Sequence, residues 1–143
     1  MSLRMFAVAL ALVTSLALAA CGSDEDTSSS SVPSAESAEE SATPAQARAE
    51  IGEVRAALDS ALASLREGDA KAAENAVSEG YLQHFEKVEG PLEKVDRELN
   101  EGLEDGIREE LRDTIRNGGS VEQVTKMTSE IKADLDNAEQ KLR

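Results

Sequence analysis

The chain's densest group of chemically versatile side chains lies in GYLQHFEKVEGPLEKV, residues 80–95. Glu86 and Glu89 stand three residues apart, and Glu93 follows four residues later. On a helix, side chains at these spacings are about 5–6 Å apart at Cβ, close enough to share a hard cation. Carboxylate oxygens suit ferric iron, calcium and magnesium. The spacing therefore predicts part of a cation site that a second helix must complete. The alternative is an exposed, solvated row of glutamates.

His84, the only histidine, precedes these glutamates and is a candidate fourth ligand. It lies between Tyr81, the only tyrosine, and Phe85, one of two phenylalanines. A histidine between two aromatic residues also suits a packing role, so both roles stay open. Because aromatic residues make up only 2% of the chain, Tyr81 and Phe85 are the bulkiest side chains available. We expect them to anchor a core.

These residues belong to the second of four apolar stripes with helical spacing, which begin at about Ala45. In chain order the stripes are Ile51, Val54, Leu58, Leu62 and Leu65; Ala73, Val77, Tyr81, Phe85 (or His84) and Val88; Leu92, Val95, Leu99, Leu103, Ile107, Leu111 and Ile115; and Val121, Val124, Thr128, Ile131, Leu135, Ala138 and Leu142. No alternation typical of β-strands appears in the sequence. We predict an all-α fold, a small antiparallel bundle of about four helices over residues 45–143.

Turn-forming and capping residues separate the stripes. Gly68-Asp69 interrupts after the first, and Asn117-Gly118-Gly119 ends the third with residues suited to a C-terminal cap. Ser120 and Gln123 have the spacing of a capping box at the start of the fourth helix. Proline has no amide hydrogen and disfavours helix for the residue before it. Gly90-Pro91 therefore predicts a break, or the first turn of the next helix.

The third stripe repeats mostly every four residues, which has a further consequence. In a regular helix each such step drifts about 40° around the axis. One core cannot then bury every member, and a leftover apolar strip would suit the docking of a partner.

The beginning of the chain, MSLRMFAVALALVTSLALAAC, has the features of a secretory signal peptide. Arg4 precedes an apolar run that is shorter than the roughly 20 residues of a membrane span, and small residues follow the run. The tetrapeptide Leu18-Ala19-Ala20-Cys21 resembles the lipobox of bacterial lipoproteins. The resemblance implies removal of residues 1–20 and acylation of Cys21 with diacylglycerol and palmitate. The alternative is an ordinary signal peptide with an incidental cysteine.

The lipoprotein interpretation places the protein on the extracytoplasmic face of a bacterial membrane, at the cell surface or in the periplasm. Two or three acyl chains would anchor it firmly. Residues 22–44 are rich in Ser, Ala and acidic residues. Such a segment cannot bury enough surface to fold, so residues 21–44 are expected to be a lipidated, disordered linker.

With 14 basic and 29 acidic residues, the mature chain would carry a formal charge of −15. Nucleic acid and anionic headgroups would be repelled, and cations or basic protein surfaces would be attracted.

The same inventory argues against an enzyme. Cys21, the only cysteine, is assigned to lipid, and a Ser-His-acid triad would depend entirely on His84. No nucleophile elbow or Gly-rich phosphate loop is present. Ferritin-like di-iron bundles need Glu-x-x-His on two helices, whereas Tyr81 stands three residues before the only histidine. We therefore predict a protein without catalytic activity.

Residues 70–142 resemble the extracytoplasmic helical region that precedes the membrane domain of some bacterial high-affinity, oxidase-dependent iron permeases. The matching positions are Tyr81-Leu82, Phe85-Glu86, Glu89, Leu92, Leu99, Glu104, Leu111-Arg112, Ile115, Gly118, Leu135, Ala138 and Leu142. The family also carries Glu-x-x-Glu motifs inside transmembrane helices. Residues 100–104, NEGLE, approach that motif, but Asn100 stands where the family has arginine, and charged residues surround it.

Two function classes follow from these observations. The resemblance implies an accessory or cation-capturing module in iron uptake, which would hold ferric iron through Glu86, Glu89, Glu93 and His84 near an iron permease. The third stripe instead favours a structural or interaction lipoprotein that docks another envelope protein through a helix face.

Overall fold

A computed structural model describes residues 42–143 of the chain. The predicted signal peptide, the lipidation site Cys21 and residues 22–41 of the predicted linker lie outside the described residues. Four helices follow one another, and two of them contain a π-helical segment. The elements are α1 (Pro44–Arg66); α2 (Ala70–Gly80), η1 (Tyr81–Phe85) and α3 (Glu86–Glu93); α4 (Arg97–Glu104), η2 (Asp105–Leu111) and α5 (Arg112–Arg116); and α6 (Val121–Lys141).

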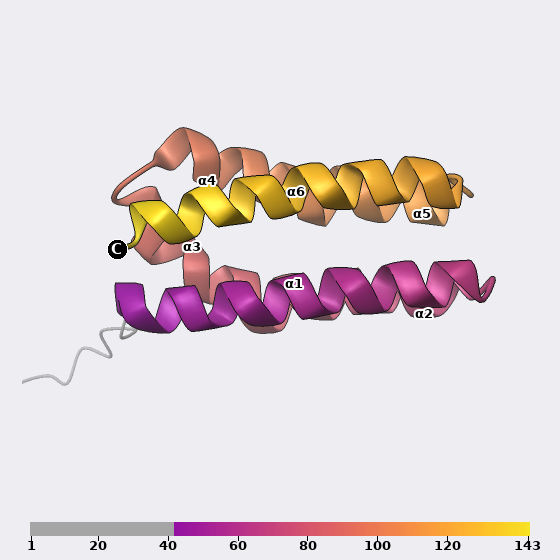
Figure 1. The fold of residues 1–143 in the computed structure, drawn as a ribbon, viewed down its shortest axis with the longest axis horizontal. Coiled ribbons are helices and arrows are strands. Elements are labelled where there is room, and N and C mark those ends of the chain that lie inside the picture. Colours follow the sequence, from indigo (N-terminus) through magenta and orange to yellow (C-terminus); the bar gives the residue numbers. More distant parts are fainter. Residues whose placement is uncertain (1–41) are drawn as a thin grey trace, which may run out of the picture. The chain divides into compact units, whose positions relative to one another are not determined.

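The predicted all-α fold, an antiparallel bundle of four helices, is confirmed for this part of the chain. The α2–α3 helix (residues 70–93) and the α4–α5 helix (residues 97–116) run without interruption through their π segments. Helix α1 lies beside the α2–α3 helix, and α6 lies beside the α4–α5 helix, so that two layers face each other (Figure 1). Within residues 42–143, none of the helices is both long and apolar enough to span a bilayer.

Polar side chains and glycines define the helix ends. At the start of α1, Gln46 N–H donates to Thr43 Oγ1 and Thr43 N–H donates to Gln46 Oε1 (2.8 Å), which completes a capping box. Ser120 caps α6 by accepting the Gln123 amide at 3.2 Å. Of the two bonds of the capping box predicted there, this one is formed among the described residues. Gly68 and Gly118 adopt positive φ values of 84° and 79° in the turns after α1 and α5, where glycine is favoured.

The helix break predicted at Gly90-Pro91 is wrong. Helix α3 continues through Pro91 to Glu93, and the chain turns at Lys94–Asp96 instead. Asp96 then caps α4 by accepting the Leu99 amide at 3.1 Å. Pro91 lies close to the end of its helix and is buried there, so its missing amide costs a single backbone hydrogen bond. Val95, predicted in the third stripe, lies in this turn and is 53% exposed.

The π segments coincide with the stretches in which apolar residues repeat every four positions. Glu86 N–H bonds to the Tyr81 carbonyl, a spacing of five residues. Such bonds wind more residues into each turn than an α-helix does and so cancel the drift of about 40° per step. Both series consequently stay in the core: Ala73, Val77, Tyr81 and Phe85 in one helix, and Leu103, Ile107, Leu111 and Ile115 in the other. The expected leftover strip is therefore not formed by these residues.

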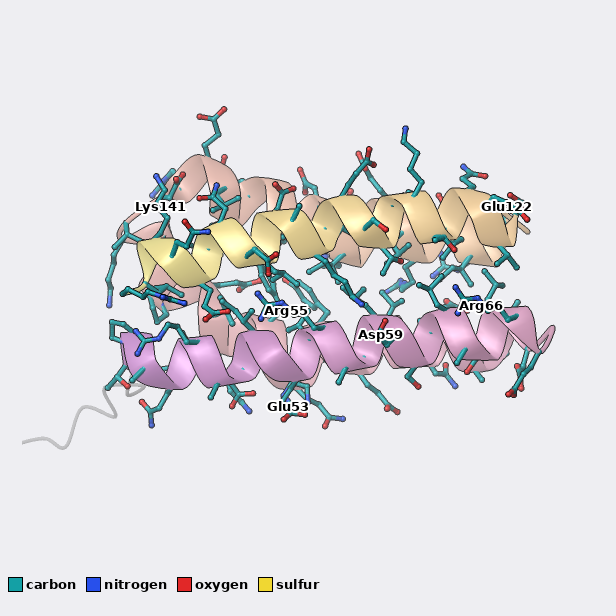
Figure 2. All side chains as sticks on the ribbon, in the orientation of Figure 1. Glu53, Arg55, Asp59, Arg66, Glu122 and Lys141 are labelled. Atoms are coloured by element: carbon teal, nitrogen blue, oxygen red, sulfur yellow. The ribbon has the colours of Figure 1, made fainter. Side chains whose placement is uncertain are left out.

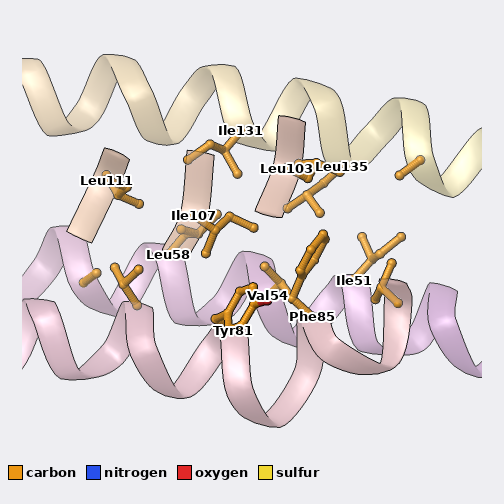
Figure 3. Packing of buried hydrophobic residues seen from close by; sticks show 14 of the residues in the cluster. Ile51, Val54, Leu58, Tyr81, Phe85, Leu103, Ile107, Leu111, Ile131 and Leu135 are labelled. Atoms are coloured by element: carbon orange, nitrogen blue, oxygen red, sulfur yellow. The ribbon is translucent and has the colours of Figure 1, made fainter. Parts of the chain in front are cut away.

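The core lies between the two layers and is mostly aliphatic. The Phe85 ring stands in its middle, fully buried, and the Tyr81 ring lies beside it with centroids 5.8 Å apart (Figure 3). Helices α1 and α2 approach so closely at Gly80 that a Cβ placed there would lie 2.6 Å from Ala57 Cβ. The packing of the α2–α3 helix therefore requires a large side chain at Phe85 and a glycine at Gly80.

Ion pairs join α1 to α6 along their common edge. Arg55 donates to Asp136 at 2.6 Å and to Glu139 at 3.1 Å, and Lys132 pairs with Asp59. Figure 2 shows Arg55 between the two helices. Each pair has at least one side chain that is only 25–30% exposed. The pairs join residues that flank the apolar stripes of the two helices.

Candidate functional site

The structure places the four predicted cation ligands in different surroundings. His84 Nδ1–H donates to Glu50 of α1 at 2.7 Å, and this bond holds the pKa of Glu50 below its ordinary value. Glu93 accepts from Arg97 at 2.6 Å, while Glu86 is exposed. Among residues 42–143, no three His, Cys, Asp or Glu side chains are grouped to hold a metal ion.

Glu89, the fourth predicted ligand, belongs to a half-buried network that we call the Tyr81 cluster: Tyr81, Glu89, Glu104 and Arg108. The Tyr81 hydroxyl donates to Glu89 Oε1 at 2.7 Å and lies 3.4 Å from Glu104 Oε1. Arg108 Nη1 donates to the same Glu104 oxygen at 2.7 Å, and its Cζ lies 5.9 Å from the Tyr81 ring centroid. The two π segments meet here, because η1 supplies Tyr81 and η2 supplies Arg108.

The electrostatics of the Tyr81 cluster oppose metal ligation. Burial, together with the bond to Glu89, raises the pKa of Tyr81 to about 12, so the phenol stays protonated and acts as a donor. Burial also raises the pKa of Glu89, and the Tyr81 bond offsets this only in part. Arg108 already supplies the positive charge that the two carboxylates would take from a metal. The cluster fixes the Arg108 side chain rather than offering an open coordination site.

A pocket of about 260 Å³ lies next to this cluster, between the α2–α3 and α4–α5 helices. Val77 and Leu82 give its wall an apolar part, and Arg108 and Arg112 give it two guanidinium groups. Leu82 is 59% exposed and is one of two large hydrophobic residues exposed in the described part of the chain. Such a combination of apolar wall and convergent charge is typical of small-ligand sites.

Arg112 is the less satisfied of the two arginines of the pocket. Its Nε is buried and has no hydrogen-bond partner within residues 42–143. The nearest carboxylate oxygen, on Glu74, is 4.0 Å away and already accepts two hydrogen bonds from Arg116 at 2.8 and 3.1 Å. Buried donors are nearly always paired with protein or water, so Arg112 has hydrogen-bonding capacity that the described residues do not use.

The sequence contains a signal for this pocket in its arginines rather than in its carboxylates. Arg108, Arg112 and Arg116 stand four residues apart, so they lie along one side of the α4–α5 helix. In a chain with 29 acidic and 15 basic residues, such a run of arginines is the exception. What the sequence cannot show is that Glu74 satisfies Arg116 but not Arg112.

Comparisons of this chain with family models, with curated proteins and with solved structures find no match. The resemblance to iron permeases therefore stays a hypothesis.

We expect Glu89→Gln to leave the free energy of unfolding unchanged at pH 7, or to raise it by at most about 1 kcal/mol. Glutamine keeps an oxygen that can accept from Tyr81 and removes a partly buried charge. Because the folded-state pKa of Glu89 lies above 4.5, its contribution to stability is fully present below about pH 4.5 and is lost as the pH rises through the folded-state pKa. The difference in stability, variant minus wild type, should thus grow between pH 4.5 and 7 in urea titrations.

The control for this prediction is Glu86→Gln, which removes an exposed carboxylate from the same helix. If Glu89→Gln costs more stability at pH 7 than Glu86→Gln does, the charged form of Glu89 is favoured in the cluster and the prediction is wrong.

Proposed function

We propose that this protein is a lipid-anchored, extracytoplasmic binding module without catalytic activity. Lipid on Cys21 would hold the bundle to the outer face of a bacterial membrane, and the pocket between the α2–α3 and α4–α5 helices would capture a ligand. The observation that carries the proposal is the pocket itself, whose lining includes both the exposed Leu82 and Arg112, a guanidinium with a buried, unpaired Nε.

The hydroxyl groups on the pocket wall support binding rather than chemistry. Ser78 donates to the Glu74 carbonyl at 3.0 Å, and Tyr81 donates to Glu89. His84, the only histidine in the chain and a candidate general base, bonds to Glu50 on α1 and does not line this pocket. Ser78 thus has no adjacent base that would activate it as a nucleophile, and the Tyr81 hydroxyl stays protonated beside Glu89 because its pKa is raised to about 12.

The anchor is tested with the full-length chain produced in a bacterial host. We expect wild type to incorporate labelled palmitate and to sediment with membranes, and Cys21→Ser to lose both properties, because the thiol is the only possible acylation site of its kind. Ser28→Ala, a change within the predicted linker, serves as the control and should behave as wild type. Palmitate labelling that persists in Cys21→Ser would refute the anchor.

Capture of ferric iron near an iron permease is the second candidate function. It is favoured by one observation, namely that oxygens of Glu89 and Glu104 both lie within 3.4 Å of the Tyr81 hydroxyl. A metal there would have to displace Arg108. Calorimetry with ferric citrate distinguishes the two functions: binding that Arg108→Ala strengthens and Glu89→Gln abolishes would favour iron, whereas no heat of binding would exclude this site.

A further inference from the structure

We propose that the pocket between the α2–α3 and α4–α5 helices binds a small organic monocarboxylate. Its carboxylate would lie on Arg112 and its apolar part on Val77 and Leu82. This assignment rests on the proposed binding function and specifies the ligand class for the same pocket.

The distribution of ion pairs makes Arg112 the anion-binding group. Of the three arginines on this side of the α4–α5 helix, Arg116 is engaged by Glu74 and Asp113, each at 2.8 Å. Arg108 is held by Glu104 at 2.7 Å and lies over the Tyr81 ring. Arg112 makes no hydrogen bond with any described residue, although its side chain is only 34% exposed. A guanidinium has five N–H donors in a planar fork that matches a carboxylate. Because Nε of Arg112 is buried, a bound carboxylate would be held by the terminal N–H groups of Arg112.

The size and wall of the pocket limit the rest of the ligand. A volume of about 260 Å³ is below the usual range of about 300–1,000 Å³ for ligand pockets, so the ligand is small. Val77 forms the closed, buried part of the wall and Leu82 its exposed part. An apolar ligand body would cover the Leu82 side chain, and its removal from water would favour binding.

Charge next to the pocket selects a monoanion over a dianion. Glu86 is part of the pocket wall, and Glu104 and Glu109 lie close to Arg108 at 2.7 and 3.8 Å. A single negative charge can be placed on Arg112 while avoiding these carboxylates, whereas a second charge would meet them and the overall negative field of the chain. The pocket should therefore prefer a carboxylate to a phosphate monoester.

Both π segments contribute to the same pocket. Tyr81 and Leu82 come from η1, Arg108 comes from η2, and Arg112 follows directly after η2. Single wide turns of this kind are frequent at functional sites. Here they bring the exposed Leu82 and the two arginines into the lining of one pocket.

The test uses full-length Cys21→Ser protein, a variant whose change lies outside the pocket, and three six-carbon probes: hexanoate, hexyl phosphate and hexanol. Binding is followed by calorimetry and by changes in the amide NMR signals of Leu82 and Arg112. We expect hexanoate to bind with a Kd below about 1 mM. Hexanol, which has no charge to pair with Arg112, and hexyl phosphate, whose second negative charge would meet the neighbouring carboxylates, should each bind at least about tenfold more weakly.

Matched variants assign the effect to residues. Arg112→Gln should weaken hexanoate binding at least about tenfold, and Leu82→Ser should weaken it severalfold. Arg97→Gln changes the net charge equally, but Arg97 pairs with Glu93 outside the pocket, so binding should stay within about twofold. Leu82 is exposed, so Leu82→Ser keeps the test valid even if circular dichroism shows that Arg112→Gln unfolds the bundle.

The remaining outcomes separate this inference from the proposed function. If hexyl phosphate binds more tightly than hexanoate and shifts the same signals, the ligand class is wrong but the pocket still binds ligands. If hexanol binds as well as hexanoate, the role of Arg112 is refuted. If none of the probes shifts Leu82 or Arg112, both the ligand class and the pocket as a binding site are refuted, while the membrane anchor is judged by the palmitate experiment.

Discussion

Phe85→Ala should lower the free energy of unfolding by about 3–5 kcal/mol, the largest loss expected from any single side chain of the bundle. Phe85 is fully buried between the two helical layers, where its ring contacts that of Tyr81 at a centroid distance of 5.8 Å. Truncation would remove both the burial of the ring and the aromatic contact and would leave a cavity that aliphatic neighbours cannot fill. Native domains are stable by about 5–15 kcal/mol, so the loss is a large fraction of the total stability and should lower the urea midpoint clearly. Urea unfolding followed by far-UV circular dichroism measures the loss.

Two variants of the same π segment calibrate this result. Leu82→Ala changes a residue that is 59% exposed and should shift stability by less than about 0.5 kcal/mol. Phe85→Leu keeps an apolar side chain in place and should cost clearly less than Phe85→Ala. If Phe85→Ala costs no more than Leu82→Ala, the ring does not hold the two layers together.

Gly80→Ala should destabilise the bundle by about 1–3 kcal/mol, although alanine is by itself the better helix former. The added Cβ would lie 2.6 Å from Ala57 Cβ, and neither of these two methyl groups can rotate away. Helices α1 and α2 would have to separate, which would loosen the packing beneath Tyr81. Thermal unfolding followed by circular dichroism gives the change in Tm.

A second substitution at Ala57 should restore the stability that Gly80→Ala loses, because the two residues are in contact. In the double variant Ala57→Gly/Gly80→Ala, the methyl group moves to the other helix and the clash disappears, so most of the loss should be recovered. Gly52→Ala is the matched control, because Gly52 also lies in a helix but a Cβ there meets nothing within 4 Å. It should raise stability by up to about 1 kcal/mol. A double variant that is as unstable as the sum of its single changes would show that the Gly80 clash lies elsewhere.

The parts of the fold that local patterns determine could be predicted from the sequence. The stripes of α1 and α6 mix steps of three and four residues, strictly alternating in α6, and a regular α-helix keeps such residues on one face. The turns at Gly68 and Gly118 and the cap at Ser120 follow from residue types with strong local preferences. These signals do not depend on the rest of the chain.

Where two local signals compete, the sequence was misleading. Pro91 indicated a helix break, but the Asp96 side chain caps the next helix, and the proline is accommodated within the last turns of α3. A series of residues four apart has two physical solutions, an apolar strip that rotates out of the core or a wide helical turn that keeps it inside. Neighbouring helices decide between them, because only the second solution buries Leu103, Ile107 and Leu111 together.

The candidate site was the least predictable part because it depends on long-range partners. Glu89 and Glu93 look equivalent in the sequence, yet one meets Tyr81 and the other meets Arg97. His84 finds its partner Glu50 on a different helix, 34 positions away in the chain. Arg112 is left without a hydrogen-bond partner because Arg116 donates to Glu74, a relation that only the folded structure shows. Which charges remain unmatched is a property of the folded bundle.

The two π segments also make the bundle unevenly tolerant of insertions and deletions. Deleting one exposed residue inside η1, such as Gln83, would let that helix return to ordinary α geometry while Val88 and Leu92 still face inward. The same deletion in the middle of α1 or α6 would rotate every later residue by about 100° and expose half of a stripe to water. The first and last helices therefore tolerate no change in length, whereas each of the two middle helices can lose one residue within its π segment.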